Sequence, residues 1–365
     1  MKITRSTIIK ILVTILTIIF VLMYFNSNAP NVSNLLDNSN KINWDYFWLG
    51  TILALLSNFL DGLAWHRILV FLDKRITALD AVITHFVGFS LGIFIPIAGT
   101  AELASKSIML QKKYPGFTSE ETVSSIAAIR TVFLVTAYVS WGFLIVSLGM
   151  ENIISFEITV IALVVVWILL TIAILILVNV FGNVNRVSAI LNFLTKESKT
   201  HSRVHTVFDI IKNWLENFSK SFHQIRSMPR KDMIVMMVLV FSQNFIKWIS
   251  VYLIYKAVLD LPFFVVMFVS VAIGFVNLIP AGIPGLAGLR EIATFEGLDI
   301  FVNDSTVSWL SSLIQSAGLY LFFLIAFLVG LPYWLKLKPV LEERKKEDLT
   351  AIESKSVSEN KEPTI

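Results

Sequence analysis

This 365-residue chain has seven candidate site residues, all of them ionisable and all within or directly after apolar stretches. They are Asp61, Glu102, Lys106, Arg130, Lys247, Arg290 and Glu291. An unpaired charge in hydrocarbon is costly, so such residues usually face one another or a polar cavity. Guanidinium groups bind phosphate through two parallel hydrogen bonds, and nearby carboxylates can hold them in place between ligands. The set therefore indicates a candidate substrate-binding site and no particular reaction.

Two of these residues form a short-range pair. Glu102 precedes Lys106 by four residues, the order that favours an ion pair on one helix face. Both follow Pro96 and Gly99, which interrupt an apolar stretch. Two interpretations are open. The pair lines a polar cavity within the membrane, or it fixes a local structure at the cytoplasmic interface.

Arg130 lies eight residues beyond Thr122, where its helix is expected to start, and this places it about 12 Å along that helix. At that depth we expect it to contact Glu102 or a lipid phosphate. Arg290 and Glu291 follow a second interruption, and Glu291 is the nearest counterpart of Glu102. They either line the same cavity or form a salt bridge at the outer interface, worth at most about 1 kcal/mol.

Covalent chemistry and metal binding have no supporting motif. The absence of cysteine excludes disulfides, thiolate nucleophiles and Cys-based metal sites. The histidines do not pair with acidic residues at metal-ligand spacing, so we expect no metal and no cofactor. They are His66, His85, His201, His205 and His223. With no nucleotide cradle, Ser/His/Asp set or DxD-like loop, we expect no enzyme activity and no nucleic acid partner.

The composition is that of a polytopic α-helical protein of the cell membrane. Hydrophobic residues make up 56% of the chain, charged residues only 15%, and the mean hydropathy is +0.75. A helix needs about 20 mostly apolar residues to cross the hydrocarbon core. Six stretches meet this requirement, at about 7–25, 47–72, 122–148, 158–181, 233–259 and 307–335.

Two further apolar stretches, at about 81–101 and 263–289, contain Pro and Gly where a continuous helix would not. We interpret them as re-entrant helical hairpins. The loop 182–232 carries nine Lys and Arg against four Asp and Glu, and positively charged loops favour the cytoplasm. Six spans and two hairpins place this loop and both termini there.

The membrane domain is expected to cover residues 1–337, followed by a disordered cytoplasmic tail at 338–365 that is rich in charge and poor in aromatics. Within the loop 182–232, apolar residues recur at spacings of three and four, with basic residues between them. They are Val207, Ile211, Trp214, Phe218, Phe222 and Ile225. This pattern predicts an amphipathic helix, lying either on the inner headgroup layer or against the protein.

The chain contains an internal repeat. The segment Asn58-Phe59-Leu60-Asp61 has a counterpart in Asn244-Phe245-Ile246-Lys247, 186 positions later. Ile95–Gly99 recurs as Ile279–Gly282, and a helix-start signal follows each, at 118–121 and 304–306. The units, at about 44–150 and 233–337, run in opposite directions through the membrane in the six-span arrangement. Inverted repeats with interrupted helices are typical of membrane transporters.

Asp61 and Lys247 occupy equivalent positions in the two units. Each lies about 14 residues into its span, so inversion places them in opposite leaflets, about 12 Å apart in depth. We therefore expect them to line a shared cavity rather than to form a direct ion pair.

At these residues the chain resembles the transmembrane domain of lysylphosphatidylglycerol synthases and related stand-alone flippase-like membrane proteins. The resemblance covers roughly residues 8–337. One block, Ile95–Glu102 followed by Lys106 and Arg130, is similar to the family's Pro…Gly-x-x-Glu…Arg block. A second, Pro280–Glu291, resembles its Pro-x-Gly-Gly-x-Gly-x-x-Glu block.

The chain departs from the family pattern in two ways. Ala101 stands where the family usually has Gly, and Lys106 stands four residues after Glu102, where an Arg is frequent nearby. Only 28 residues follow Leu337, so the soluble aminoacyl-transferase domain of the synthases is not expected here, nor is lysyl transfer.

What the resemblance implies is the translocase half, which moves a lipid between leaflets. The substrate would be a phospholipid or a polyprenyl-linked glycan. Two alternatives stay open. One is a membrane transferase that acts on a lipid-linked substrate with Glu102 or Glu291 as base; the other is a non-catalytic partner of a separate lipid-modifying enzyme.

Overall fold

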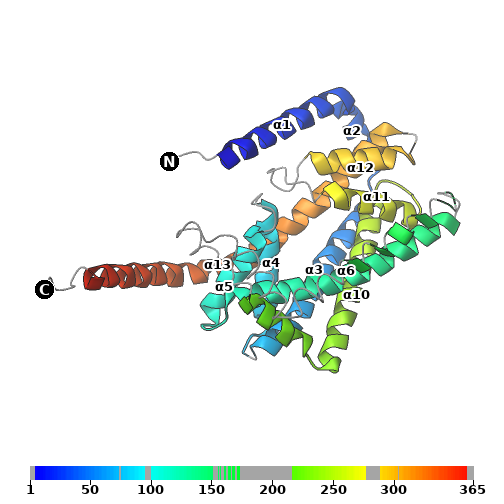
Figure 1. The fold of residues 1–365 in the computed structure, drawn as a ribbon. Coiled ribbons are helices and arrows are strands. Elements are labelled where there is room, and N and C mark those ends of the chain that lie inside the picture. The colour runs from blue at the N-terminus through cyan, green and yellow to red at the C-terminus, as the bar shows by residue number, and fades with distance from the viewer. Residues whose placement is uncertain are drawn as a thin grey trace.

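The computed structural model of the protein describes residues 5–73, 75–94, 100–150, part of 155–172, 216–276, 288–302 and 304–359. Within these ranges the chain is helical and contains no strand. The helices run α1 (Arg5–Asn28), α2 (Val32–Ser39), α3 (Trp44–Leu72), α4 (Ala78–Phe94), α5 (Thr100–Lys113), α6 (Ser119–Met150), α10 (Arg230–Lys256), α11 (Phe263–Val276), α12 (Leu289–Asp299) and α13 (Ser305–Glu359). Figure 1 shows their arrangement.

The same order of helix lengths occurs twice. A long helix is followed by two short helices and another long helix in α3–α6, and again in α10–α13. The short helices of each set pack against each other, α4 on α5 and α11 on α12. The predicted Pro/Gly interruptions, at 95–99 and 279–287, lie outside the described residues.

Three described helices are long and apolar enough to cross a membrane, namely Trp44–Leu72, Arg230–Lys256 and Ser305–Pro332. They correspond to the predicted spans at 47–72, 233–259 and 307–335. On α3, four large apolar side chains spaced by three or four residues are each 42–58% exposed. They are Trp48, Ile52, Leu56 and Phe59. A stripe of this kind is the face that a spanning helix turns toward lipid.

The other three predicted spans have different outcomes. Those at 7–25 and 122–148 fall on α1 and α6, and their crossing of the membrane stays a prediction. The predicted span at 158–181 lies largely outside the described residues.

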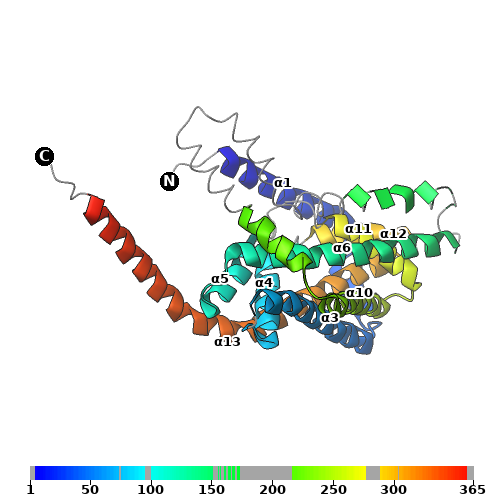
Figure 2. The ribbon, with the colours of Figure 1, turned by 60° about the horizontal axis from the view of Figure 1, so that its bottom comes forward.

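Helices α3 and α10 form the most extensive helix pair in the structure and run antiparallel (Figure 2). The Ser57 hydroxyl donates to the Gln243 carbonyl oxygen over 3.1 Å, and the Ser250 hydroxyl donates to the Gly50 carbonyl oxygen over 2.7 Å. Small residues at this interface let the two backbones approach closely. Ser57 and Gln243 are 186 positions apart, the offset of the sequence repeat. Equivalent positions of the two units therefore touch.

Both predicted helix starts are confirmed. At the start of α6, the Glu121 amide donates to the Thr118 hydroxyl, and the Thr118 amide donates to the Glu121 carboxylate over 2.7 Å. This reciprocal pair is a capping box. At the start of α13, the Asp304 carboxylate accepts the Thr306 amide over 2.9 Å.

The structure differs from the sequence prediction at the C-terminal tail. Helix α13 continues to Glu359, whereas residues 338–365 were predicted to be disordered. Figure 1 shows this part projecting away from the other helices. Charge and low hydrophobicity argue against a packed core, yet the segment is rich in Glu and Lys, which favour a helix even without one.

The C-terminal part of the loop 182–232 is described and helical over residues 216–226. Phe218 and Ile225 are each only 6% exposed, and Ile225 belongs to a core cluster with residues of α3, α5 and α6. Lys220 and Arg226 face outward. For this part the apolar face packs against the protein. Val207, Ile211 and Trp214 lie outside the described residues.

Candidate functional site

Close packing of α4 on α5 positions the Glu102–Lys106 pair. A Cβ atom at Gly88 would lie 2.5 Å from the Lys106 Cγ, and one at Gly92 would lie 2.9 Å from the Glu102 Cβ. Only glycine at these two positions of α4 leaves room for the stems of both charged side chains. The sequence of α4 therefore sets where the charged groups of α5 lie.

Glu102 joins two cations. Its Oε1 lies 2.5 Å from the Lys106 Nζ and 3.3 Å from a terminal guanidinium nitrogen of Arg130. Lys106 is only 2% exposed and lies 5.0 Å from the centre of the Trp65 ring. A buried ammonium with a carboxylate on one side and an aromatic face on another is well compensated. The two predicted contacts of Glu102, with Lys106 and with Arg130, are both present.

His85 of α4 is a further member of this set and was not among the seven predicted site residues. Its Nδ1 lies 3.2 Å from the Lys106 Nζ, and its Nε2 lies 3.4 Å from the Asp61 carboxylate. The imidazole is 2% exposed and stacks on Phe89. Asp61, His85, Lys106, Glu102 and Arg130 thus form one continuous chain of ionisable groups from four helices.

Lys247 and Arg290 bring charge from the second repeat unit. Lys247 interacts electrostatically with Arg130, Asp61 and Arg290. The Lys247 Nζ and the Arg130 guanidinium lie 5.8 and 5.9 Å from the centre of the same Phe133 ring. Among the described residues, no carboxylate lies within 4.0 Å of the Lys247 Nζ. Asp61 and Lys247 are therefore near each other without forming a direct ion pair.

Arg290 lies in the first turn of α12, and its Nε is buried without a hydrogen-bond partner among the described residues. It interacts electrostatically with Glu291 and with Tyr320 of α13. The structure shows no ion pair between Arg290 and a described carboxylate, the neighbouring Glu291 included. Along α13, several buried polar atoms also lack hydrogen-bond partners among the described residues. They are the side-chain oxygens of Ser308, Ser311, Gln315, Ser316 and Tyr320.

Glu291 has a different environment from Glu102. Its carboxylate accepts the backbone amide of Gly288 over 2.6 Å, and its carbonyl oxygen accepts the Ser312 hydroxyl over 2.7 Å. Gly288 adopts a positive φ of 86°, a conformation that favours glycine. Glu291 thus caps its own helix, so the structure brings six of the seven predicted site residues toward one region and gives this one a local partner.

The charges and exposures define the character of the cluster. The cluster contains four cations, at Lys106, Arg130, Lys247 and Arg290, and the two carboxylates of Asp61 and Glu102. With Glu291, which interacts electrostatically with Arg290, four cations stand against three carboxylates. Arg130 is 37% exposed and Lys247 is exposed, whereas Lys106 and His85 are fully enclosed. The accessible part is therefore cationic and the enclosed part is neutralised internally. Cations in excess of carboxylates are costly in a membrane-spanning helix bundle, and a bound anion would lower that cost.

A second ionic cluster occupies the other end of the α4–α5 pair. The Asp80 carboxylate accepts hydrogen bonds from the Thr77 hydroxyl over 2.6 Å and from the Tyr114 hydroxyl, and it pairs with Lys113. Burial and the adjacent Asp80 raise the pKa of Tyr114, which keeps its hydroxyl a donor. We call these four residues the Asp80 cluster. The Glu102 cluster comprises Asp61, His85, Glu102, Lys106 and Arg130, together with Lys247 and Arg290.

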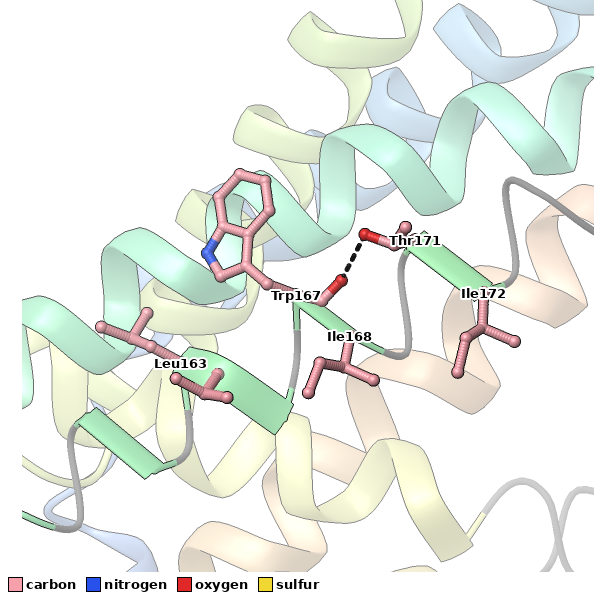
Figure 3. Close-up of a pocket in the computed structure, with 6 residues that line it drawn as sticks. Leu163, Trp167, Ile168, Thr171 and Ile172 are labelled. Carbon is pink, nitrogen blue, oxygen red and sulfur yellow. Dashed lines mark hydrogen bonds between the residues drawn. The ribbon is translucent and has the colours of Figure 1, made fainter.

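The described residues also form a shallow apolar groove of about 460 Å³. It is lined by Leu163, Val164, Trp167, Ile168, Thr171 and Ile172. Figure 3 shows its one polar contact, in which the Thr171 hydroxyl donates to the Trp167 carbonyl oxygen over 2.8 Å. Trp167 and Ile168 are each 53% exposed. The groove has the apolar surface of a lipid-facing segment, and no residue of the Glu102 cluster lines it.

No group of three or more His, Asp or Glu residues lies together in the described part of the chain as a metal site would require.

The helices and the Glu102 cluster define the class of the protein, which is an all-helical membrane protein with a cationic polar site among its spans. The chain belongs to the family of the lysylphosphatidylglycerol synthase TM region, whose model matches residues 7–329. No curated protein and no solved structure matches the chain.

Proposed function

We propose that the protein moves a lipid between the leaflets of the membrane without covalent chemistry. The lipid would be a phospholipid or a polyprenyl-linked glycan. The observation that carries this proposal is the Glu102 cluster, in which more cations than carboxylates meet among helices that face lipid. A translocase must shelter a charged headgroup while the acyl chains remain in hydrocarbon, and a partly exposed cationic site between spans meets that need.

Arg130 and Lys247 are the groups that would receive the headgroup phosphate. Both are accessible, both lie beside Phe133, and Lys247 has no described carboxylate partner within 4.0 Å. A guanidinium binds phosphate in bidentate fashion. The Glu102 carboxylate, at 3.3 Å, holds Arg130 between substrates, so phosphate and Glu102 compete for the same guanidinium.

The proposal includes six spans, two re-entrant hairpins and cytoplasmic termini, arranged as an inverted repeat. Antiparallel packing of α3 on α10 supports it, since equivalent residues of the two units, Ser57 and Gln243, are in contact. The chain has no native cysteine, so a single cysteine at Ser198 can be labelled without background. Reaction with an impermeant reagent in intact cells would contradict the proposed orientation.

Transfer of fluorescent lipids in reconstituted vesicles tests the function. Purified protein is reconstituted with headgroup-labelled phosphatidylglycerol or with a labelled polyprenyl phosphate, and an impermeant quencher reports the fraction in the outer leaflet. Glu102→Gln and Arg130→Gln should each abolish transfer and leave the protein folded. Arg75→Gln is the matched control, because Arg75 forms an exposed ion pair with Asp73. Wild-type rates in both cluster variants would make their charges structural only.

A further inference from the structure

His85 is the one histidine of the Glu102 cluster, and its imidazole lies between two groups of opposite charge. Its ordinary titration range lies within the physiological one. In the structure its two nitrogens contact groups of opposite charge, the Asp61 carboxylate at 3.4 Å and the Lys106 ammonium at 3.2 Å. The Nε2 is buried and has no hydrogen-bond partner among the described residues.

These contacts determine the tautomer of the neutral His85 imidazole. The Lys106 ammonium can only donate, so the His85 Nδ1 accepts and the proton of the neutral ring lies on Nε2, toward Asp61. A second proton would go to Nδ1, where it would displace the donation from Lys106. Lys106 would then rely on Glu102 alone, at 2.5 Å. Stronger pairing of Glu102 with Lys106 weakens its pairing with Arg130, because one oxygen serves both cations.

Three helices around the imidazole contribute charged groups that act on it directly. Asp61 comes from α3, Glu102 and Lys106 from α5, and Arg130 from α6. Lys247 of α10 and Arg290 of α12 act at one remove, through Asp61 and Arg130. On α13, the residues packed against α4 at Phe86 and Phe89 are the uncharged rings of Phe322 and Phe323. A proton on His85 therefore adds to a set that already carries excess positive charge.

We propose that His85 is a proton-binding site coupled to the headgroup site, so that an anionic headgroup and a proton bind together. This inference rests on the proposed function. The headgroup phosphate removes the excess positive charge that opposes protonation of His85. The proton in turn releases Arg130 from Glu102 to the phosphate. Each ligand thus raises the affinity for the other by the same factor, and a pH gradient can drive the headgroup across the membrane.

Isothermal titration calorimetry with dihexanoyl phosphatidylglycerol, a water-soluble probe, tests the coupling in detergent. Buffers of different ionisation enthalpy give the number of protons bound per lipid. For the wild type we expect uptake of up to about one proton and an affinity that rises about fivefold or more from pH 8 to pH 6. His85→Gln should bind the probe with neither effect. His223→Gln, an exposed histidine, should keep both.

Proton uptake that persists in His85→Gln would overturn the proposal, and so would binding by the wild type without proton uptake. Both results leave lipid binding, and hence the proposed function, intact. If the probe does not bind at all, the proposed function fails for this lipid class. Proton binding by His85 is then measured without lipid. Nitrogen-15 spectra of histidine-labelled protein should then contain one titrating signal that is absent from His85→Gln and shifted to lower pH in Asp61→Asn. A His85 signal that does not titrate between pH 4.5 and 8 overturns the proton site.

Discussion

The Asp80 cluster and the Glu102 cluster share helices α4 and α5, and each contains a carboxylate paired with a lysine of α5, yet they differ in how completely their groups are paired. The Asp80 carboxylate is surrounded by donors from Thr77, Tyr114 and Lys113. In the Glu102 cluster, Lys247 lacks a described carboxylate partner within 4.0 Å and the buried Nε2 of His85 lacks a described hydrogen-bond partner.

The contrast separates two uses of buried charge. A fully paired carboxylate stabilises the contact between elements, because its removal would leave several donors buried without an acceptor. A set with surplus cations gains little stability by itself, and it acquires its missing partner when an anion binds. Substitutions in the first cluster should therefore change stability, and substitutions at the unpaired positions of the second should change lipid transfer.

The largest effect on stability is expected at Asp80. Asp80→Ala leaves the Thr77 and Tyr114 hydroxyls without their acceptor, at a cost of about 2–3 kcal/mol. Thermal unfolding followed by the intrinsic fluorescence of the nine tryptophans measures it. Lipid transfer per folded molecule should stay at the wild-type rate, and a loss of transfer with unchanged stability would break the distinction between the clusters.

The second-largest effect on stability is expected at Gly88, where a substitution should change both stability and lipid transfer. A Cβ there would lie 2.5 Å from the Lys106 Cγ, so Gly88→Ala must displace the lysine stem or separate α4 from α5. Overpacking of this kind costs about 1–3 kcal/mol. Both the unfolding temperature and the transfer rate should fall. Unchanged transfer would show that the position of Lys106 does not matter for the site.

Lys247→Met should affect function alone. Because the Lys247 Nζ has no described carboxylate within 4.0 Å, its removal leaves no described carboxylate without an ion-pair partner. The unfolding temperature should therefore stay the same or rise. Loss of one phosphate-binding charge should slow lipid transfer at least about tenfold, which corresponds to roughly 1.4 kcal/mol. Lys256→Met, at an exposed ion pair with Asp260, is the control. Lower stability with normal transfer would place Lys247 among the structural residues.

The smallest effect is expected at the exposed pair of Asp73 and Arg75, between α3 and α4. Hydrogen bonds from Arg75 lower the pKa of Asp73. The resulting stabilisation is present above the unfolded pKa of about 3.9 and is lost as the pH falls through the lowered folded value. Because solvent screens the pair, Asp73→Asn should leave the unfolding temperature at pH 7 nearly unchanged. A large shift would mean that exposed and buried charges cannot be separated in this protein.

Local sequence signals predicted much of this molecule. The capping residues Thr118 and Asp304, the spacing of Glu102 and Lys106, and the three membrane-length helices depend on neighbours along the chain, which a sequence displays directly. The offset of 186 also predicted which residues of α3 and α10 are equivalent, and two of these, Ser57 and Gln243, are in contact.

Features that depend on tertiary packing could not be predicted in the same way. His85 is 24 positions from Asp61 and 21 from Lys106, and no helical period connects them, so its place in the cluster requires the packing of α3, α4 and α5. The buried hydroxyls of Ser311 and Ser316 look unremarkable in a sequence, since hydroxyls are common in spanning helices. Glu291 resembled Glu102 by position in the repeat but serves as a helix cap.

The proposed function requires the Glu102 cluster to present an accessible cationic site to an anionic headgroup. The centre of the Phe133 ring lies within 6 Å of both the Arg130 guanidinium and the Lys247 Nζ, so Phe133→Cys places a thiol near two cations that the substitution retains. Its reaction with an anionic and a cationic methanethiosulfonate reagent measures both access and local charge. We predict that the anionic reagent reacts at least about tenfold faster and that dihexanoyl phosphatidylglycerol slows it. Faster reaction with the cationic reagent, or no reaction with either, would contradict the account.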